Sequence, residues 1–331
     1  MAITRRQFLA RTAAAAAWAT AAGPLLRANP AWASNSCTLG VWATNLLTLE
    51  RKLGYTFRGI RYNQAMNCPI PTPRELEWVD QGRWFIYRNV NAQTRNKYGA
   101  AICRSWQAIA SGYYDNYFIH GARALKRDGR FTAQRPYLFS FHHEQIVKSD
   151  HQCGNRSCGT AAQYIAAYRR VRNIFDKHGA TVREGGNVRF VWTPTASQFR
   201  MPDGPFGAPK VDPGPHFYDY VGVDGYNRLS HGKLLFTDPA EMLGPAHDYA
   251  VSQGKRLLIA EYGVEDGSTI PSHVAKENFM LATAAEIQSW GKSGAGSALG
   301  WLFSSTDGNR LDSSPASIHA MHLILQMPFY A

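Results

Sequence analysis

The chain has 331 residues, of which 45% are hydrophobic, and carries a formal net charge of +12 at pH 7. This length is sufficient for one large domain with its own core. The basic residues are spread along the chain without the aromatic-basic pattern of a nucleic-acid-binding module, which argues against a nucleic-acid partner. The positive charge remains compatible with an acidic or envelope-associated glycan.

Residues 1–33 have the pattern of an export signal of the twin-arginine type. Arg5 and Arg6 in "TRRQFLA" precede an alanine-rich apolar stretch, and "AWAS" supplies small residues for cleavage after Ala33. An amphipathic first helix is the alternative. No other stretch approaches the ~18 uninterrupted apolar residues of a membrane span. The pattern predicts a secreted or periplasmic protein whose residues 34–331 form one domain, with a formal charge lowered to +8 by loss of the signal's four arginines.

After the signal, short apolar runs alternate with helical patterns. Strands are expected over residues 39–43, 56–61, 84–89, 137–142, 188–193, 220–225, 256–261 and 300–305. Helices are expected over residues 73–81, 113–129, 160–179, 239–254, 272–290 and 314–326. Eight strands separated mostly by helices predict an α/β fold of the (β/α)8 or TIM-barrel type. A doubly wound sheet is the main alternative, but no glycine-rich phosphate turn follows the first strand.

Two further patterns refine this expectation. Tyr164, Tyr168, Val171 and Phe175 recur at helical spacing, which is typical of a buried helix face. The Pro- and Gly-rich stretch 200–216 predicts a long loop after the fifth strand.

Five cysteines in an exported chain allow two disulfides and one leftover thiol. Cys153 and Cys158 enclose a short loop in "HQCGNRSCGT" and are the best candidates for a local disulfide. Cys68 and Cys103 are a second possible pair, which would leave Cys37 unpaired. Zinc would need two further soft ligands that this segment lacks.

Two acidic residues stand at the ends of predicted strands. Glu144 follows "YLFSFHH" after the fourth strand, and Glu261 ends "RLLIAE" at the seventh. In a barrel the carboxyl ends of all strands open onto one face, so these two side chains are expected to face each other. Paired carboxylates cleave glycosides, because one protonates the leaving oxygen while the other attacks, and a retaining mechanism places them about 5–5.5 Å apart. This reaction needs no cofactor.

Several segments resemble glycoside hydrolase family 26, the β-mannanase-like enzymes whose catalytic acids end barrel strands four and seven. The resemblance is carried by "RPYLFSFHHE", "NVRFVWTP", "DPGPHFYDYVGVDGYN" and "GKRLLIAEYG", and it runs from residue 112 to the C-terminus. It implies that Glu144, preceded by His143, is the general acid/base and that Glu261 is the nucleophile. It further implies that Tyr226 contacts the nucleophile and that Trp301 contacts a sugar.

Other residues around the two acids have less certain roles. His143 is a candidate for orienting Glu144 or contacting substrate, with a core histidine as the alternative. Asp224 is a candidate for binding a sugar hydroxyl or for holding its own loop. The family commonly has a basic residue where Ser140 stands, and an asparagine and a tryptophan after the acid, where this chain has Ile146 and no tryptophan. The resemblance therefore predicts a β-linked polysaccharide substrate without naming mannan.

Alternative functions remain open at this point. A metal site in "HHE" is not expected, because successive strand residues point to opposite faces and no His-Glu-x-x-His spacing occurs; His142 is expected to be structural. The sequence predicts an exported, retaining and endo-acting glycoside hydrolase that acts as a monomer. A non-catalytic glycan-binding protein on the same barrel is the main alternative, and a lyase or transglycosylase is another.

Overall fold

The computed structural model describes residues 37–95, 101–145, 158–227, 229–230, 233–234, 237–265, 271–291, 293–306 and 309–330. The expected signal peptide, residues 1–33, lies outside this described part. So does Cys153.

Eight parallel strands form a closed barrel in the order β1-β12-β11-β8-β7-β6-β3-β2. Their bounds are β1 Thr38–Ala43, β2 Gly59–Ala65, β3 Phe85–Asn91, β6 Tyr137–Phe141, β7 Val188–Trp192, β8 Tyr220–Asn227, β11 Arg256–Val264 and β12 Ala298–Ser305. Each corresponds to one of the eight expected strands, so the predicted (β/α)8 barrel is confirmed. In chain order β6 is the fourth barrel strand and β11 is the seventh.

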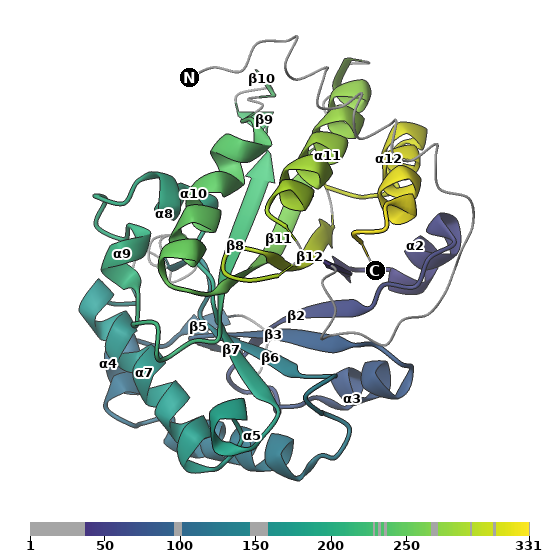
Figure 1. The fold of residues 1–331 in the computed structure, drawn as a ribbon. Helices are drawn as coiled ribbons and strands as arrows, with labels where there is room; N and C mark the ends of the chain where they lie inside the picture. Colours follow the sequence, from purple (N-terminus) through teal and green to yellow (C-terminus); the bar gives the residue numbers. More distant parts are fainter. Residues whose placement is uncertain are drawn as a thin grey trace. The chain divides into compact units, whose positions relative to one another are not determined.

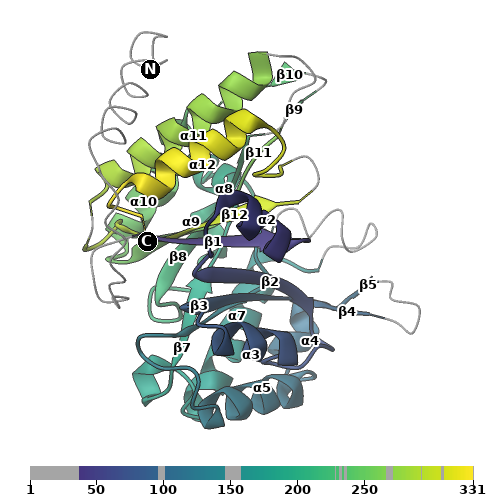
Figure 2. The same cartoon turned by 90° about the vertical axis from the view of Figure 1, so that its right-hand side faces the viewer.

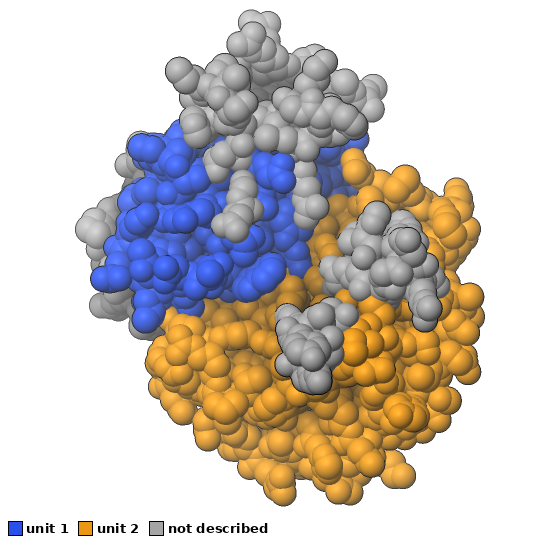
Figure 3. All heavy atoms as spheres, turned by 180° about the vertical axis from the view of Figure 1, so that it is seen from behind, with its two compact units in different colours: residues 1–58, 225–331 blue, residues 59–224 orange. Residues whose placement is uncertain are grey.

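Contacts between residues divide the chain into two compact units (Figure 3). One consists of residues 59–224, and the other consists of the described parts of residues 1–58 and 225–331. The division falls inside strand β8, between Asp224 and Gly225, so no linker separates the units at that point.

Within residues 59–224, strands β2, β3, β6, β7 and the beginning of β8 pair in succession, all parallel. The helices of this unit are α3 Pro73–Asp80, α4 Trp106–Ala110, α5 Asp115–Arg127, α7 Ala161–Lys177, α8 Ala196–Arg200 and α9 Ala208–Val211, with a hairpin of β4 Gln93–Arg95 and β5 Ala101–Cys103. Helix α7 packs against both α4 and α5 (Figure 1).

The sequence of β6 explains how this unit is held together. Phe139 contacts Phe175 of α7 with ring centroids 4.8 Å apart, and Phe141 stacks on Tyr164 at 6.4 Å. Each buried aromatic side chain contributes about 1.5–3 kcal/mol to stability. All four residues of the predicted helix stripe, Tyr164, Tyr168, Val171 and Phe175, are completely buried. That prediction is confirmed.

In the other unit, β12 pairs in parallel with both β1 and β11. Its helices are α2 Leu46–Leu53, α10 Pro239–Ser252, α11 Pro271–Ser289 and α12 Pro315–Gln326, and a small hairpin joins β9 Leu229–Ser230 to β10 Lys233–Leu234. Helices α11 and α12 lie side by side (Figure 2).

Element boundaries differ from the expected ones where polar residues occupy strands. Strand β2 was expected over 56–61 but begins at Gly59, where an added Cβ would lie 2.4 Å from the Phe85 ring, and it continues through Asn63 and Gln64. Apolar patterning cannot reveal such a polar strand end. The short helix α2 was not expected, and the predicted loop 200–216 contains the four-residue helix α9.

No helix in the described part of the chain is long and apolar enough to cross a membrane.

The cysteines only partly follow expectation. Cys37 and Cys68 are free thiols, so the alternative Cys68–Cys103 pair is wrong. Because Cys153 lies outside the described residues, its expected bond with Cys158 stays a prediction. Peptide mapping without reduction distinguishes that bond from one between Cys103 and Cys158.

The two free thiols should differ sharply in reactivity. Cys37 is completely buried, and its burial raises the pKa of the thiol, whereas Cys68 is partly exposed. Since the thiolate is the reactive form, we expect iodoacetamide to label Cys68 in the native protein and Cys37 only after unfolding. Mass spectrometry of peptides from native and denatured samples measures this. Equal labelling of both cysteines in the native state would contradict the expected difference.

Candidate active site

The segment after β6 leaves the strand in an unusual conformation. Strand β6 ends at Phe141, one residue earlier than expected, and both His142 and Glu144 have left-handed backbone angles, with φ of 50° and 51°. Non-glycine residues in this region carry about 1–3 kcal/mol of strain, and such strain concentrates at functional sites. The strand alternation assumed for "HHE" therefore does not apply beyond Phe141.

Neighbouring strands hold this strained segment. His142 N donates to Val90 O at 2.9 Å, and Glu144 N donates to Thr193 O at 3.0 Å. The two donors tie the segment to the residues of β3 and to the residue after β7. Glu144 is thereby fixed by its backbone while its side chain stays partly exposed.

His142 has the structural role that was expected. It is completely buried, and its Nδ1 accepts from Ala92 N at 3.1 Å and from Trp106 Nε1 at 3.2 Å. Two donors on Nδ1 place the imidazole proton on Nε2.

His143 lies in a buried polar cluster. Its Nδ1 is 2.6 Å from Asp224 Oδ2 and 3.1 Å from Arg61 Nη2. Nδ1 either carries a proton and donates it, or has a free lone pair and accepts, so it cannot serve both partners at once. The shorter contact indicates that Nδ1 carries the proton and donates to Asp224. His143 N also donates to Asn89 Oδ1 at 3.0 Å. The ring orientation beside Glu144 is therefore fixed from two sides.

The cluster also decides the role of Asp224. This residue lies on β8, is 2% exposed, and binds His143. The Asp224 carboxylate therefore positions the His143 ring, a role that differs from the two considered for it. The contact favours an orienting role for His143, and sugar binding by Asp224 stays a prediction.

A metal ion is a further chemical possibility for these side chains. Ligand atoms of His143, Glu144 and Asp224 lie within 4.8 Å of one another, so the geometric argument against an ion from strand alternation was wrong. Arg61 gives a better argument against a metal ion here. Its guanidinium lies 3.1 Å from His143 Nδ1, which already donates to Asp224. A fixed positive charge at this place disfavours a second cation.

Glu261 lies in the other unit, near the end of β11, and is 4% exposed. The hydroxyl of Tyr226 donates a short hydrogen bond to Glu261 Oε2. Gly263 makes this contact possible, because a Cβ there would lie 2.7 Å from the Tyr226 ring and 2.9 Å from Asn309 Cγ. The tyrosine and the glutamate expected to touch each other do so.

Trp301 is not where a sugar contact would lie. It is completely buried, with its ring 4.9 Å from Tyr262 and 4.5 Å from Phe303. A side chain without exposed surface cannot stack on a sugar ring. The expected sugar contact is therefore wrong, and Trp301 is a buried core residue on β12.

Sequence reasoning missed Arg61, Asn89 and Gly263. Arg61 and Asn89 lie in β2 and β3 beside apolar residues, and both are buried. A charged or amide residue directly after the apolar part of a strand was the available signal, since such a group must find partners when it is buried. Gly263 is the last residue of the family-like segment "GKRLLIAEYG", but its importance depends on Tyr226, which lies in another segment.

No protein-family model matches the chain, and no curated protein matches it either. Solved structures do. The catalytic domain of the GH26 endo-β-1,4-mannanase from Bacillus sp. JAMB-750 matches with TM-score 0.59 and 12% identity, covering 97% of this chain and 91% of that one. GH26C from a Muricauda species gives TM-score 0.60 and 13% identity, covering 98% and 90%. Two fungal β-1,4-galactanases give TM-score 0.51 and 10% identity, covering 87% and 99%. At these identities the likeness establishes the fold alone.

Proposed function

We propose that the protein is a glycoside hydrolase that cleaves a β-linked polysaccharide, with Glu144 as general acid/base and Glu261 as nucleophile. One observation carries the proposal: Glu144 follows β6 and Glu261 lies near the carboxyl end of β11, and these are the fourth and seventh strands of a closed parallel barrel. In such a barrel the carboxyl ends of the strands share one face, where catalytic groups gather. The solved structures of similar fold include GH26 mannanases and galactanases.

The contacts around Glu261 suit a nucleophile. The Tyr226 hydroxyl donates to Oε2 and so holds the carboxylate that would attack the anomeric carbon in one orientation. A donated hydrogen bond also favours the ionised carboxylate that nucleophilic attack requires. In a retaining mechanism this attack gives a covalent glycosyl-enzyme, which water then hydrolyses.

The contacts around Glu144 suit an acid/base. Its backbone is held by Thr193 O, and the neighbouring His143 is fixed by Asp224 and Asn89. A group that first gives and later takes a proton must keep one position through both steps. The strained backbone of Glu144 is consistent with such a requirement.

A substrate panel tests the proposal. Mannan, xylan, mixed-linkage glucan and acidic exopolysaccharides should be incubated with wild type, Glu261→Ala and the exposed control Glu241→Ala, with reducing ends as readout. We expect one polysaccharide to be cut at internal bonds by wild type and by Glu241→Ala, with β products formed first as seen by NMR. Binding without cleavage by wild type across the whole panel would instead establish a glycan-binding protein.

We also propose that the protein is exported through the twin-arginine route, cleaved after Ala33, and acts as a monomer. The paired arginines and the small residues before Ser34 support this. Expression in a host with and without a functional twin-arginine system tests export. The mature N-terminus should be Ser34, and light scattering should give the monomer mass.

Tyr226 and Gly263 give a prediction about the nucleophile's surroundings. Tyr226→Phe removes the hydroxyl bonded to Glu261 and should lower kcat by about 10- to 100-fold, the range for a hydrogen bond to a charged group. Gly263→Ala should have a similar effect, because its Cβ would displace the Tyr226 ring. The control is Gly244→Ala in α10, where a Cβ meets nothing within 4 Å. If Gly263→Ala were as active as Gly244→Ala, the proposed role of Tyr226 would be wrong.

A further inference from the structure

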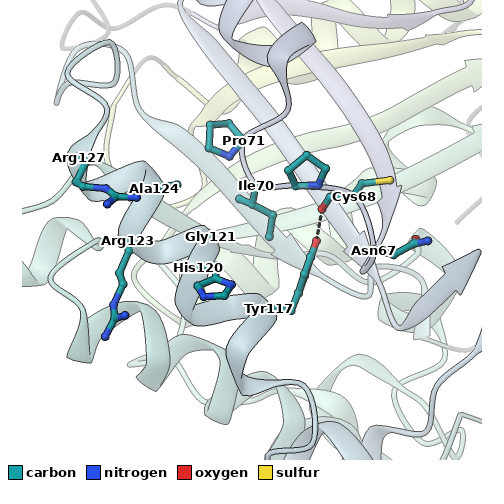
Figure 4. Close-up of a pocket in the computed structure, with 11 residues that line it drawn as sticks. Asn67, Cys68, Ile70, Pro71, Tyr117, His120, Gly121, Arg123, Ala124 and Arg127 are labelled. Carbon is teal, nitrogen blue, oxygen red and sulfur yellow. Dashed lines mark hydrogen bonds between the residues drawn. The ribbon is translucent and has the colours of Figure 1, made fainter.

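A hollow of about 630 Å³ opens in residues 59–224, between helix α5 and the loop that follows β2 (Figure 4). One wall is formed by residues 67–71, and the other is formed by α5 with Tyr117, His120, Arg123 and Arg127. None of these residues belongs to the proposed catalytic groups. The volume lies within the range of about 300–1,000 Å³ that is typical of small-ligand sites.

The helix wall of the hollow is basic. His120, Arg123 and Arg127 recur at positions i, i+3 and i+7 of α5, which places them on one helix face, and all three are exposed. No acidic side chain lines the hollow. Among the described residues, none forms an ion pair or a side-chain hydrogen bond with any of the three.

Two exposed arginines elsewhere in the same unit show the contrast with the hollow, because each faces a carboxylate. Arg130 Nη1 lies 3.3 Å from Asp80 Oδ2, and Arg183 Nε lies 3.3 Å from Glu184 Oε1. Partial burial, followed by the charges of Arg123 and Lys177, lowers the pKa of His178 on the adjacent helix end. The charge of Arg123 therefore acts on a neighbouring titratable group.

The opposite wall is held rigidly. The Tyr117 hydroxyl donates to Cys68 O at 2.9 Å, and Arg88 Nη2 donates to Pro69 O at 3.3 Å. Ile70 is 4% exposed and packs closely on α5. A Cβ added at Gly121 would lie only 2.9 Å from the Cβ of Ile70. A preformed hollow needs little ordering when a ligand enters, which favours binding.

We propose that this hollow is a second carbohydrate site, which binds a segment of an acidic oligosaccharide. Arg123 and Arg127 hold a carboxylate or sulfate of the glycan, and the accessible apolar faces of Pro69 and Pro71 contact the sugar rings. Arginine suits this task because its planar guanidinium forms paired hydrogen bonds with an oxyanion. Such a site would keep an acidic polymer on the protein independently of the bond being cleaved.

Binding by the full mature chain tests the proposal, with Glu261→Ala as the background so that no probe is consumed. The probes are an oligogalacturonate, a neutral manno-oligosaccharide of equal length, and sodium sulfate, each measured by calorimetry at low and moderate salt. We expect Arg123→Gln/Arg127→Gln to weaken oligogalacturonate binding about tenfold or more, and to flatten its salt dependence. Arg51→Gln/Arg200→Gln removes the same charge from exposed positions outside the hollow and should leave binding unchanged.

Several results would overturn the site. These are equal oligogalacturonate binding by both double variants, equal affinity for the neutral oligosaccharide, or binding of sulfate without the oligosaccharide. A second variant, Ala124→Leu, adds apolar bulk to the half-buried helix wall of the hollow without changing charge and should also weaken binding at an unchanged melting temperature. Because cleavage is not the readout, the result does not depend on whether the proposed hydrolase activity is found.

Discussion

Replacing Glu261 with alanine is expected to lower the rate of glycoside cleavage by about 10⁴-fold or more, because removal of a nucleophile leaves only binding and charge stabilisation. The Tyr226 hydrogen bond shows that this carboxylate is already held in one orientation. Adding azide should restore turnover in Glu261→Ala and give a glycosyl azide of inverted configuration, since a small anion can attack where the carboxylate is missing.

Replacing Glu144 with alanine should give a different pattern. The loss is expected to be about 10²- to 10⁴-fold on the natural polysaccharide, the range for a general acid/base. Aryl glycosides with an acidic phenol leaving group need no protonation, so their first step should be nearly normal. Azide should then give a product of retained configuration. The opposite stereochemistry of the two rescued products assigns the two roles separately.

Control variants make these outcomes decisive. Glu241→Ala removes an exposed carboxylate from the first turn of α10 and should keep wild-type kinetics. If Glu144→Ala lost as little activity as Glu241→Ala, the assignment of the acid/base would fail. Retention of melting temperature in each variant excludes simple unfolding as the cause.

Replacing Glu75 with alanine should destabilise the fold more than any surface change. Glu75 Oε1 and Oε2 accept from Arg88 Nη1 at 3.0 and 3.1 Å, and neither side chain is exposed. The same carboxylate accepts from Tyr137 OH at 3.1 Å and from Thr72 N at 2.6 Å. Its loss leaves the Arg88 guanidinium buried and unpaired, which costs about 3–5 kcal/mol of the free energy of unfolding.

Glu77 on the same helix is the matched control. It pairs with Arg74 at the surface, where both side chains are nearly half exposed, so Glu77→Ala should cost less than about 1 kcal/mol. Urea denaturation of both variants measures the difference. The double variant Glu75→Ala/Arg88→Met should recover part of the loss, since no buried charge remains. Equal unfolding free energies for Glu75→Ala and Glu77→Ala would refute the argument.

The barrel could be predicted because its strands carry apolar runs that helices separate. All eight strands follow from local pattern, since strand and helix periodicities depend on neighbouring residues. The polar ends of β2 and β3 could not be predicted in the same way. Besides neighbours on their own strands, Arg61 and Asn89 have a partner from a distant segment, the ring and the backbone of His143.

The sequence by itself determined the barrel class, the helix faces and the two glutamates at strand ends, because each depends on periodicity or on position along one strand. The tertiary structure alone decided what each side chain touches. It placed Trp301 in the core, Asp224 on His143 and the Tyr226 ring against Gly263. Those contacts depend on which strands become neighbours and on how His142 and Glu144 turn the chain after Phe141. Contacts between segments that are distant in the chain leave no pattern among neighbouring residues, so the sequence alone does not reveal them.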